Sequence, residues 1–362
     1  MPTATVDRPL LYSARPVLTV AGQARPELAA ALSSLAVAET TDGLFHLEAT
    51  VGNWGAAPGG IGYLYFGRDV LDFGAEVAVE MGAGDAQGKI FAGRISALEA
   101  RFPIQRPPEI TFLAEDRLQD LRMTRRTRTF EQASLTDVVR RVASDHGLTP
   151  DLDVDDLTLP VFAQLDQTDL AFLRDLARMA DAELWADGTT LHLQARARRR
   201  GASVTLTFGQ TLREFQVTAD LAHQRTSLRV SGWDVDGKAA IDEEATDACL
   251  GGEVGSMASG ASVLRSKLGD RVERVVHAMP VSTREARARA EAAFRRDARR
   301  FVCGRAVAEG DARLRVGARV TLGELGPLFN GAYDVTETRH LFDWRNGYRT
   351  LFTVERPGLG NP

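Results

Sequence analysis

The first third of the chain alternates apolar and polar residues with a period of two. Residues 45–51 (FHLEATV) and 76–81 (EVAVEM) show this alternation, and residues 89–98 and 109–114 continue it. A period of two is typical of a half-buried β-strand. The pattern predicts a β region, with the glycine- and proline-rich residues 54–62 as a loop.

The middle of the chain follows a helical period. Apolar residues between positions 135 and 143 recur at i, i+3, i+4, i+7 and i+8, which places them on one helix face. These residues are Leu135, Val138, Val139, Val142 and Ala143. Ser134 and Asp137 form a capping box at the start of this helix. A second apolar stripe predicts a helix over residues 168–180, and Asp187-Gly188 predicts the turn of a hairpin within residues 183–194.

Strand patterning returns at residues 204–208 and 228–230, and again over about the last sixty residues of the chain. Residues 236–270 are poor in pattern and rich in Gly, Ser and Asp, so we expect a loop-like segment. Ser282 and Glu285 form a capping box that opens a basic helix to about Phe301. Its narrow apolar stripe consists of Ala286, Ala290, Ala293 and Phe294.

These patterns predict an α+β fold that is mainly β. We expect two related small β-barrel domains, with a small α/β domain inserted between them. The predicted boundaries are residues 1–124 for the first β-barrel, 125–198 for the inserted domain, 199–235 plus 302–362 for the second β-barrel, and 236–301 for an extension.

The two β regions repeat the same short motifs in the same order. The matches are 74–79 (GAEVAV) with 317–322 (GARVTL), 91–95 (FAGRI) with 329–333 (FNGAY), and 112–115 (FLAE) with 352–355 (FTVE). Chance similarity between alternating strands is the competing explanation, but three ordered matches favour duplication. A trimer of such chains would present six similar units in a ring, which suits an adaptor between a sixfold tube and a threefold needle.

Composition narrows the possible partners. The chain is 44% hydrophobic and 26% charged, with a net charge of −5, so it has no global basic excess to bind nucleic acid. No stretch approaches the ~20 apolar residues that span a bilayer, and we expect no membrane insertion. Residues 1–9 lack the apolar core of an export signal, so we expect assembly in the cytoplasm.

Candidate chemistry is sparse, and we predict no catalytic, cofactor-binding or metal-binding residue and no enzymatic activity. Cys249 and Cys303 are too scattered for a disulfide framework or a zinc site. The six histidines are also scattered. The best metal candidate is the acidic cluster Asp151, Asp153, Asp155 and Asp156. It lacks the glycine and closing glutamate of a calcium loop, so a solvated loop is favoured.

Two arginine clusters flank the predicted inserted domain. They are Arg122, Arg125, Arg126 and Arg128, and Arg196, Arg198, Arg199 and Arg200. No aromatic residues lie among them, which disfavours nucleic acid binding. We predict salt-bridged junctions between domains or subunits, with a solvated surface as the alternative.

Three stretches together resemble a known family. They are residues 114–118 (AEDRL) through 128–139 (RTFEQASLTDVV), residues 164–177 (QLDQTDLAFLRDLA) followed by 183–193, and residues 329–340 (FNGAYDVTETRH) with 347–350 (GYRT). Their order resembles the baseplate hub family of contractile injection systems, which includes the phage late control protein D group and the hub part of type VI secretion spike proteins.

The resemblance implies a structural homotrimer whose β-barrels form a pseudo-hexameric ring between inner tube and spike. Its implied partners are further copies of itself, the inner tube protein, the spike protein and baseplate wedge proteins. We expect it in a phage-tail-like particle that can become extracellular on release. No β-prism repeat follows the second β region, so we expect the spike to be a separate chain. The alternative is a cell-wall glycan-binding protein of such a particle, because the β-α-α-β order of residues 128–194 resembles small glycan-binding folds.

Overall fold

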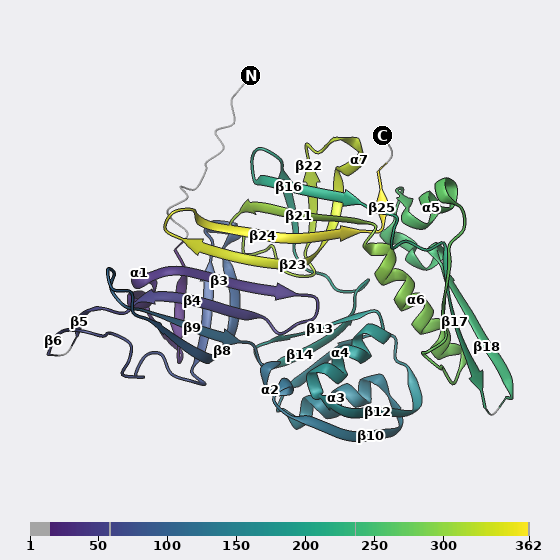
Figure 1. The fold of residues 1–362 in the computed structure, drawn as a ribbon, viewed down its shortest axis with the longest axis horizontal. Coiled ribbons are helices and arrows are strands. Elements are labelled where there is room, and N and C mark those ends of the chain that lie inside the picture. Colours follow the sequence, from purple (N-terminus) through teal and green to yellow (C-terminus); the bar gives the residue numbers. More distant parts are fainter. Residues whose placement is uncertain (1–14, 58, 236, 361–362) are drawn as a thin grey trace.

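The computed structural model of the chain describes residues 15–57, 59–235 and 237–360 (Figure 1). Its elements are mostly strands, with fewer helices, so the prediction of a mainly β fold is confirmed. Residues 1–9, on which the expectation about an export signal rests, lie outside the described part. None of the helices in these ranges is long and apolar enough to cross a membrane.

Within the described residues, thirteen strands form one sheet in the order β16-β21-β24-β23-β3-β4-β9-β8-β7-β1-β2, with β15 and β22 branching from β23. The strands from the first β region, here called the first module, are β1 (Val17–Val20), β2 (Gln23–Ala24), β3 (Leu32–Thr40), β4 (His46–Gly52), β7 (Glu76–Met81), β8 (Gly88–Arg101) and β9 (Glu109–Glu115). Those of the second module are β15 (Ser203–Thr207), β16 (Leu212–Ala219), β21 (Val302–Glu309), β22 (Arg319–Gly323), β23 (Gly331–Asp343) and β24 (Gly347–Arg356).

Smaller elements complete the two modules. They are α1 (Pro26–Ala31), β5 (Gly55–Ala57), β6 (Gly60–Gly62), the 3-10 helix η1 (Gly84–Ala86), α7 (Gly326–Phe329) and β25 (Gly358–Leu359). Each module has its own hydrophobic core, because alternate residues of its strands point inward. Leu35 and Val37 of β3 are buried in the first core, and Val320 and Leu322 of β22 in the second.

Strand pairing repeats between the modules. The order β3-β4-β9-β8-β7 of the first module matches β16-β21-β24-β23-β22 of the second. Bulges recur at matching places, in β8 between Ile95 and Ala97 and in β23 between Val335 and Glu337. A matching bulge also interrupts β3 after Leu32 and β16 after Leu212. The same irregularities in the same order support a duplication.

Backbone hydrogen bonds fix the register of the repeat. The Gly74 N–H donates to the Ile95 carbonyl at 2.8 Å, and the Gly317 N–H donates to the Val335 carbonyl at 3.0 Å. Both glycines have positive φ, 77° and 84°, which favours glycine at these turns. The first sequence match therefore holds. The third holds as well, because Phe112 faces Leu98 and Phe352 faces the equivalent Thr338.

The middle match is displaced by two residues. Gly93 faces Val77 across the ladder, and the residue that faces the equivalent Val320 is Tyr333, not Gly331. The shared Phe-x-Gly spacing is a coincidence, because a different residue occupies the equivalent position in each strand.

The two modules are joined directly by β3 and β23. Residues 34–40 pair antiparallel with residues 337–343, so one sheet runs through both modules. In the described part of the chain, no strand pairing closes either module into a barrel. The expected closed barrels are therefore replaced by one shared, open sheet, in which β8 and β23 each change partners along their length.

The inserted region forms a compact α/β unit with its own core. Its elements are β10 (Arg125–Ser134), α3 (Leu135–Asp145), β11 (Thr149–Asp153), β12 (Thr158–Thr168), α4 (Asp169–Met179), β13 (Ala182–Asp187) and β14 (Thr190–Ala195), preceded by α2 (Gln119–Arg122). Both predicted helices are present. Ser134 caps α3 through the Asp137 N–H at 3.2 Å, and Gly188 makes the β13–β14 turn with φ 57°.

The extension is more ordered than its sequence pattern indicates. It contains β17 (Ser227–Asp234), β18 (Ala239–Thr246), the 3-10 helix η2 (Asp247–Glu253), β19 (Ala258–Ser259), α5 (Gly260–Leu268), β20 (Val272–Val275) and α6 (Thr283–Arg299). The expectation of a loop over residues 236–270 is wrong. Strand β18 pairs with β17 along its whole length, although only Ile241 and Ala245 of β18 are buried. Strand β17 pairs here rather than in the second module.

Candidate functional site

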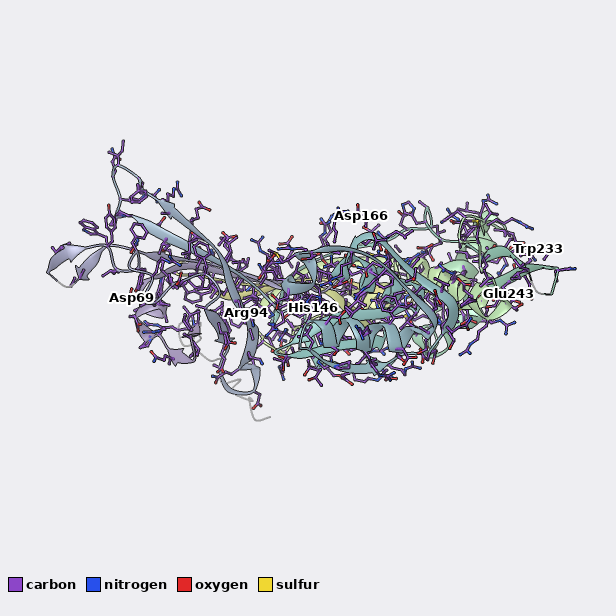
Figure 2. The ribbon with its side chains drawn as sticks, turned by 90° about the horizontal axis from the view of Figure 1, so that it is seen from below. Asp69, Arg94, His146, Asp166, Trp233 and Glu243 are labelled. Carbon is purple, nitrogen blue, oxygen red and sulfur yellow. The ribbon has the colours of Figure 1, made fainter. Side chains whose placement is uncertain are left out.

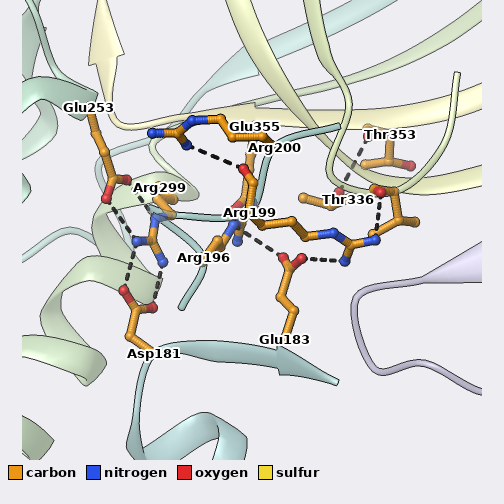
Figure 3. A network of polar contacts seen from close by, with 11 residues as sticks. Asp181, Glu183, Arg196, Arg199, Arg200, Glu253, Arg299, Thr336, Thr353 and Glu355 are labelled. Atoms are coloured by element: carbon orange, nitrogen blue, oxygen red, sulfur yellow. Dashed lines mark hydrogen bonds and ion pairs between the residues drawn. The ribbon is translucent and has the colours of Figure 1, made fainter. Parts of the chain in front are cut away.

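Buried charges gather where the second module, the inserted domain and the extension meet (Figure 3). Arg299 of α6 is only 2% exposed. Its guanidinium donates to Asp181 at 2.5 and 2.7 Å, and to Glu253 at 2.7 and 2.8 Å. Burial alone would lower the pKa of Arg299, but the hydrogen bonds with Glu253 and Asp181 outweigh it and raise that pKa. The arginine is therefore a permanent positive charge that holds α6, η2 and the end of α4 together.

Two residues of the second arginine cluster complete this junction. Arg196 lies 2.5 Å from Glu355 of β24 and 3.4 Å from Glu183 of β13. Arg199 donates to Glu183 at 2.6 Å and to the Val316 carbonyl at 2.7 Å. Both side chains connect the inserted domain to the second module, as predicted.

Arg198 has a different role. It pairs with Asp153 at 2.8 Å and with Asp155 at 2.9 Å, so it binds the acidic cluster. Asp151 contacts His192 at 2.7 Å, and Asp156 accepts a hydrogen bond from Thr136. Asp153 and Asp155 share Arg198, whereas Asp151 and Asp156 have other partners. Across the described ranges, no group of three or more His, Cys, Asp or Glu is arranged to hold a metal.

The first arginine cluster is mostly internal to the inserted domain, so it does not form the predicted junction between domains. Arg126 and Arg128 both reach Asp169, at 3.1 and 2.8 Å, and Asp169 is 1% exposed. Arg125 pairs with Asp166 of the neighbouring strand. The antiparallel pairing of β10 with β12 brings these charges together, which a linear sequence does not reveal.

A second buried polar group lies where β3 meets β23, and the sequence did not identify it. His340 is fully buried, and its Nδ1 lies 2.9 Å from the Tyr348 hydroxyl and 3.2 Å from the Thr350 hydroxyl. Burial, together with the nearby charge of Arg315, lowers the pKa of His340 to about 3. Glu39 pairs with Arg315 across the same junction. The inward position of His340 in an alternating strand was the available clue.

Exposed aromatic residues of the first module gather where residues 54–66 meet the end of β8. Trp54, Tyr63, Phe66 and Phe102 form neighbouring ring contacts, with centroids 4.8 to 6.2 Å apart. Buried Asn53 anchors this segment, because its side-chain oxygen accepts the N–H groups of residues 64 and 65. All four rings are more than one-third exposed, so they form an apolar surface at the end of β8.

Solved structures share this fold across nearly the whole chain. The 43 kDa tail protein of prophage MuSo2 from Shewanella oneidensis has a TM-score of 0.69 at 14% identity, covering 95% of this chain and 99% of that one. A tail protein from Neisseria meningitidis MC58 has a TM-score of 0.68 at 12% identity, covering 96% and 98%. The E. coli c3393 protein, described as a component of the type VI secretion system, has a TM-score of 0.56 at 10% identity, covering 91% and 76%.

Comparison with curated proteins gives no match. A family model described as the Alg8 N-terminal domain matches residues 67–343. The match begins in the first module, contains the inserted domain and the extension, and ends within the second module. Because it covers well over half of the sequence, the chain belongs to the Alg8 N-terminal domain family.

Proposed function

We propose that the chain is a structural subunit of a phage-tail-like injection machine, namely its baseplate hub. Three copies would form a pseudo-hexameric ring that connects the inner tube to the spike, with wedge proteins around it. The observation that carries the proposal is the side-by-side arrangement of two equivalent modules, paired through β3 and β23 in one sheet. The fold shared with phage tail proteins supports the same setting.

A chain of two equivalent units suits a symmetry mismatch. A cyclic trimer of such chains has six similar units on one face and threefold symmetry overall. The six units match a sixfold tube, and the threefold axis matches a trimeric spike. The same arrangement would let each module act as one tube-type unit of the ring. We further propose that the ring assembles in the cytoplasm before it enters the particle.

A structural rather than catalytic role is part of the proposal. Its support is that the buried ionisable groups of the junction are committed to ion pairs between parts of the chain. A hollow beside Trp344, lined partly by Arg15, holds only about 110 Å³. Ligand pockets usually enclose several hundred Å³.

Co-purification with the particle's own tube and spike proteins tests the adaptor role. We expect the chain to bind both, in complexes that contain three copies of the chain for six tube subunits. Binding to insoluble cell wall, with no binding to tube or spike, would instead support the glycan-binding alternative. The inserted domain expressed in the same assay shows whether any wall binding resides there.

A further inference from the structure

The duplication gives each of the two strands at the junction an equivalent strand in the other module. The edges of those two equivalent strands are therefore candidates for the same kind of pairing. Residues 34–40 of β3 pair with residues 337–343 of β23. The matching bulges place residues 214–220, in and after β16, at the position of 34–40. The matching β8 and β23 bulges place residues 97–103 at the position of 337–343.

Both of these edges are open in the described chain. Strand β16 is at one end of the sheet order and pairs only with β21 among the named strands. From Ala97 onward, β8 pairs only with β9, since its pairing with β7 ends at Arg94. Open edges present unpaired N–H and carbonyl groups that a further strand can complete.

Side chains at the end of β8 are more exposed than their equivalents at the end of β23. Phe342 is 6% exposed, belongs to the first core and lies opposite Leu35. Phe102, its equivalent, is 58% exposed. Trp344 donates to the Leu32 carbonyl at 2.5 Å, whereas Ile104, at the equivalent position, is fully exposed.

We propose that residues 97–103 of one copy pair antiparallel with residues 214–220 of a second copy, and that Phe102 packs there against Phe215. This proposal rests on the proposed ring and names the strands through which neighbouring chains of the ring would contact each other. The register follows from the internal junction, where Arg339 faces Ala38. It places Glu99 opposite Thr218 and Phe102 opposite Phe215. Phe215 is half-buried against the second core, so part of its ring is free to contact Phe102 of the neighbouring copy.

Directed disulfide formation tests this register. We would combine Glu99→Cys with Thr218→Cys, because directly opposed residues of an antiparallel pair have Cβ atoms about 4.5–5.5 Å apart. This separation is close to the Cβ spacing that a disulfide requires. Mild oxidation should convert most of the chain into covalent oligomers that end at the trimer. The matched control combines Glu99→Cys with Val217→Cys, since adjacent strand residues point to opposite faces. Both pairs are built in a Cys249→Ser, Cys303→Ser background, because Cys303 of β21 lies directly opposite Thr218 in the same chain and would compete for the new thiol.

Equal crosslinking in the matched and shifted pairs, or none in a protein that light scattering shows to be trimeric, overturns the edge pairing and leaves the ring proposal intact. A protein that neither crosslinks nor forms trimers overturns both.

A second variant tests the aromatic contact without disulfides. Phe102→Ser should raise the concentration at which trimers form by about tenfold or more, because a buried aromatic anchor carries much of an interface's affinity. Trp233→Ser is the control, because Trp233 is 55% exposed and lies near one end of the molecule, far from Arg94 of β8 (Figure 2). Unchanged assembly of the Phe102→Ser protein would contradict the proposed packing.

Discussion

Arg299 carries a charge that is almost fully removed from water and is shared between Asp181 and Glu253. Replacing it with leucine would leave two carboxylates without their partner at the junction. Removing one member of a buried ion pair typically costs about 3–5 kcal/mol. We therefore expect Arg299→Leu to lower the free energy of unfolding by that amount, measured by urea denaturation.

The control for this prediction lies on the same helix. Arg287 is 65% exposed in its side chain and pairs with Glu243. An exposed pair contributes about 0–1 kcal/mol, so Arg287→Ala should have a small effect. Equal losses for the two variants would show that the Arg299 network does not hold the junction together.

His340 makes the stability of the module junction sensitive to acid. Its pKa is about 3 in the folded chain and 6.5 in its ordinary state. The unfolded chain therefore binds a proton that the folded chain does not between these values, and stability is lost as pH falls from about 6.5 toward 3. Between pH 7.5 and 5.5 the loss of stability from this group is about 1 kcal/mol.

Urea unfolding at the two pH values measures this loss, and His340→Gln is the comparison because glutamine does not titrate. The variant should lose less stability than the parent over the same interval. An identical loss in the parent and the variant would contradict the prediction, because His340 would then have the same pKa in the folded and unfolded chain.

Some residues of the two junctions could be predicted from the sequence, and others could not. Arg196 and Arg199 were identified because arginines cluster at a predicted domain boundary. Arg299 was not singled out within its basic helix, because its partners come from residues 46 and 118 positions away along the chain. Glu39 and His340 were missed for the same reason, since their burial depends on a strand pairing that joins the two ends of the chain.

Helix α6 shows what periodicity can establish for an element. Its predicted stripe is present, with Ala286, Ala290 and Phe294 buried against β17 and β18. Ala290 is 0% exposed, so there is no space for a larger side chain. Overpacking a filled core typically costs about 1–3 kcal/mol. We expect Ala290→Leu to lower the melting temperature, whereas Ala288→Leu, at a partly exposed position, should change it little. Equal shifts would contradict the packing of this face.

Strand β18 shows where periodicity fails. Its sequence AAIDEEAT has few apolar residues, because one side faces solvent and carries the acidic partners of Arg229. The strand forms because β17 supplies a complete antiparallel ladder, a tertiary effect that local pattern does not contain.

At the scale of the whole molecule, the duplication was predictable and its geometry was not. Alternation and ordered motifs established two related β regions around an α/β insert. They could not show that β3 and β23 fuse the regions into one sheet, or that Gly93 and Gly331 are not equivalent. Contacts between residues about 300 positions apart are determined by the folded chain rather than by local pattern.

We propose that three chains make one ring of six modules. Light scattering after size exclusion, over a range of concentrations and with the spike protein added, tests it most directly. We expect the chain alone, or its share of a complex with the spike, to have a mass of three times 39.3 kDa, or about 118 kDa. A species of 39.3 kDa at every concentration, with or without spike, would contradict it.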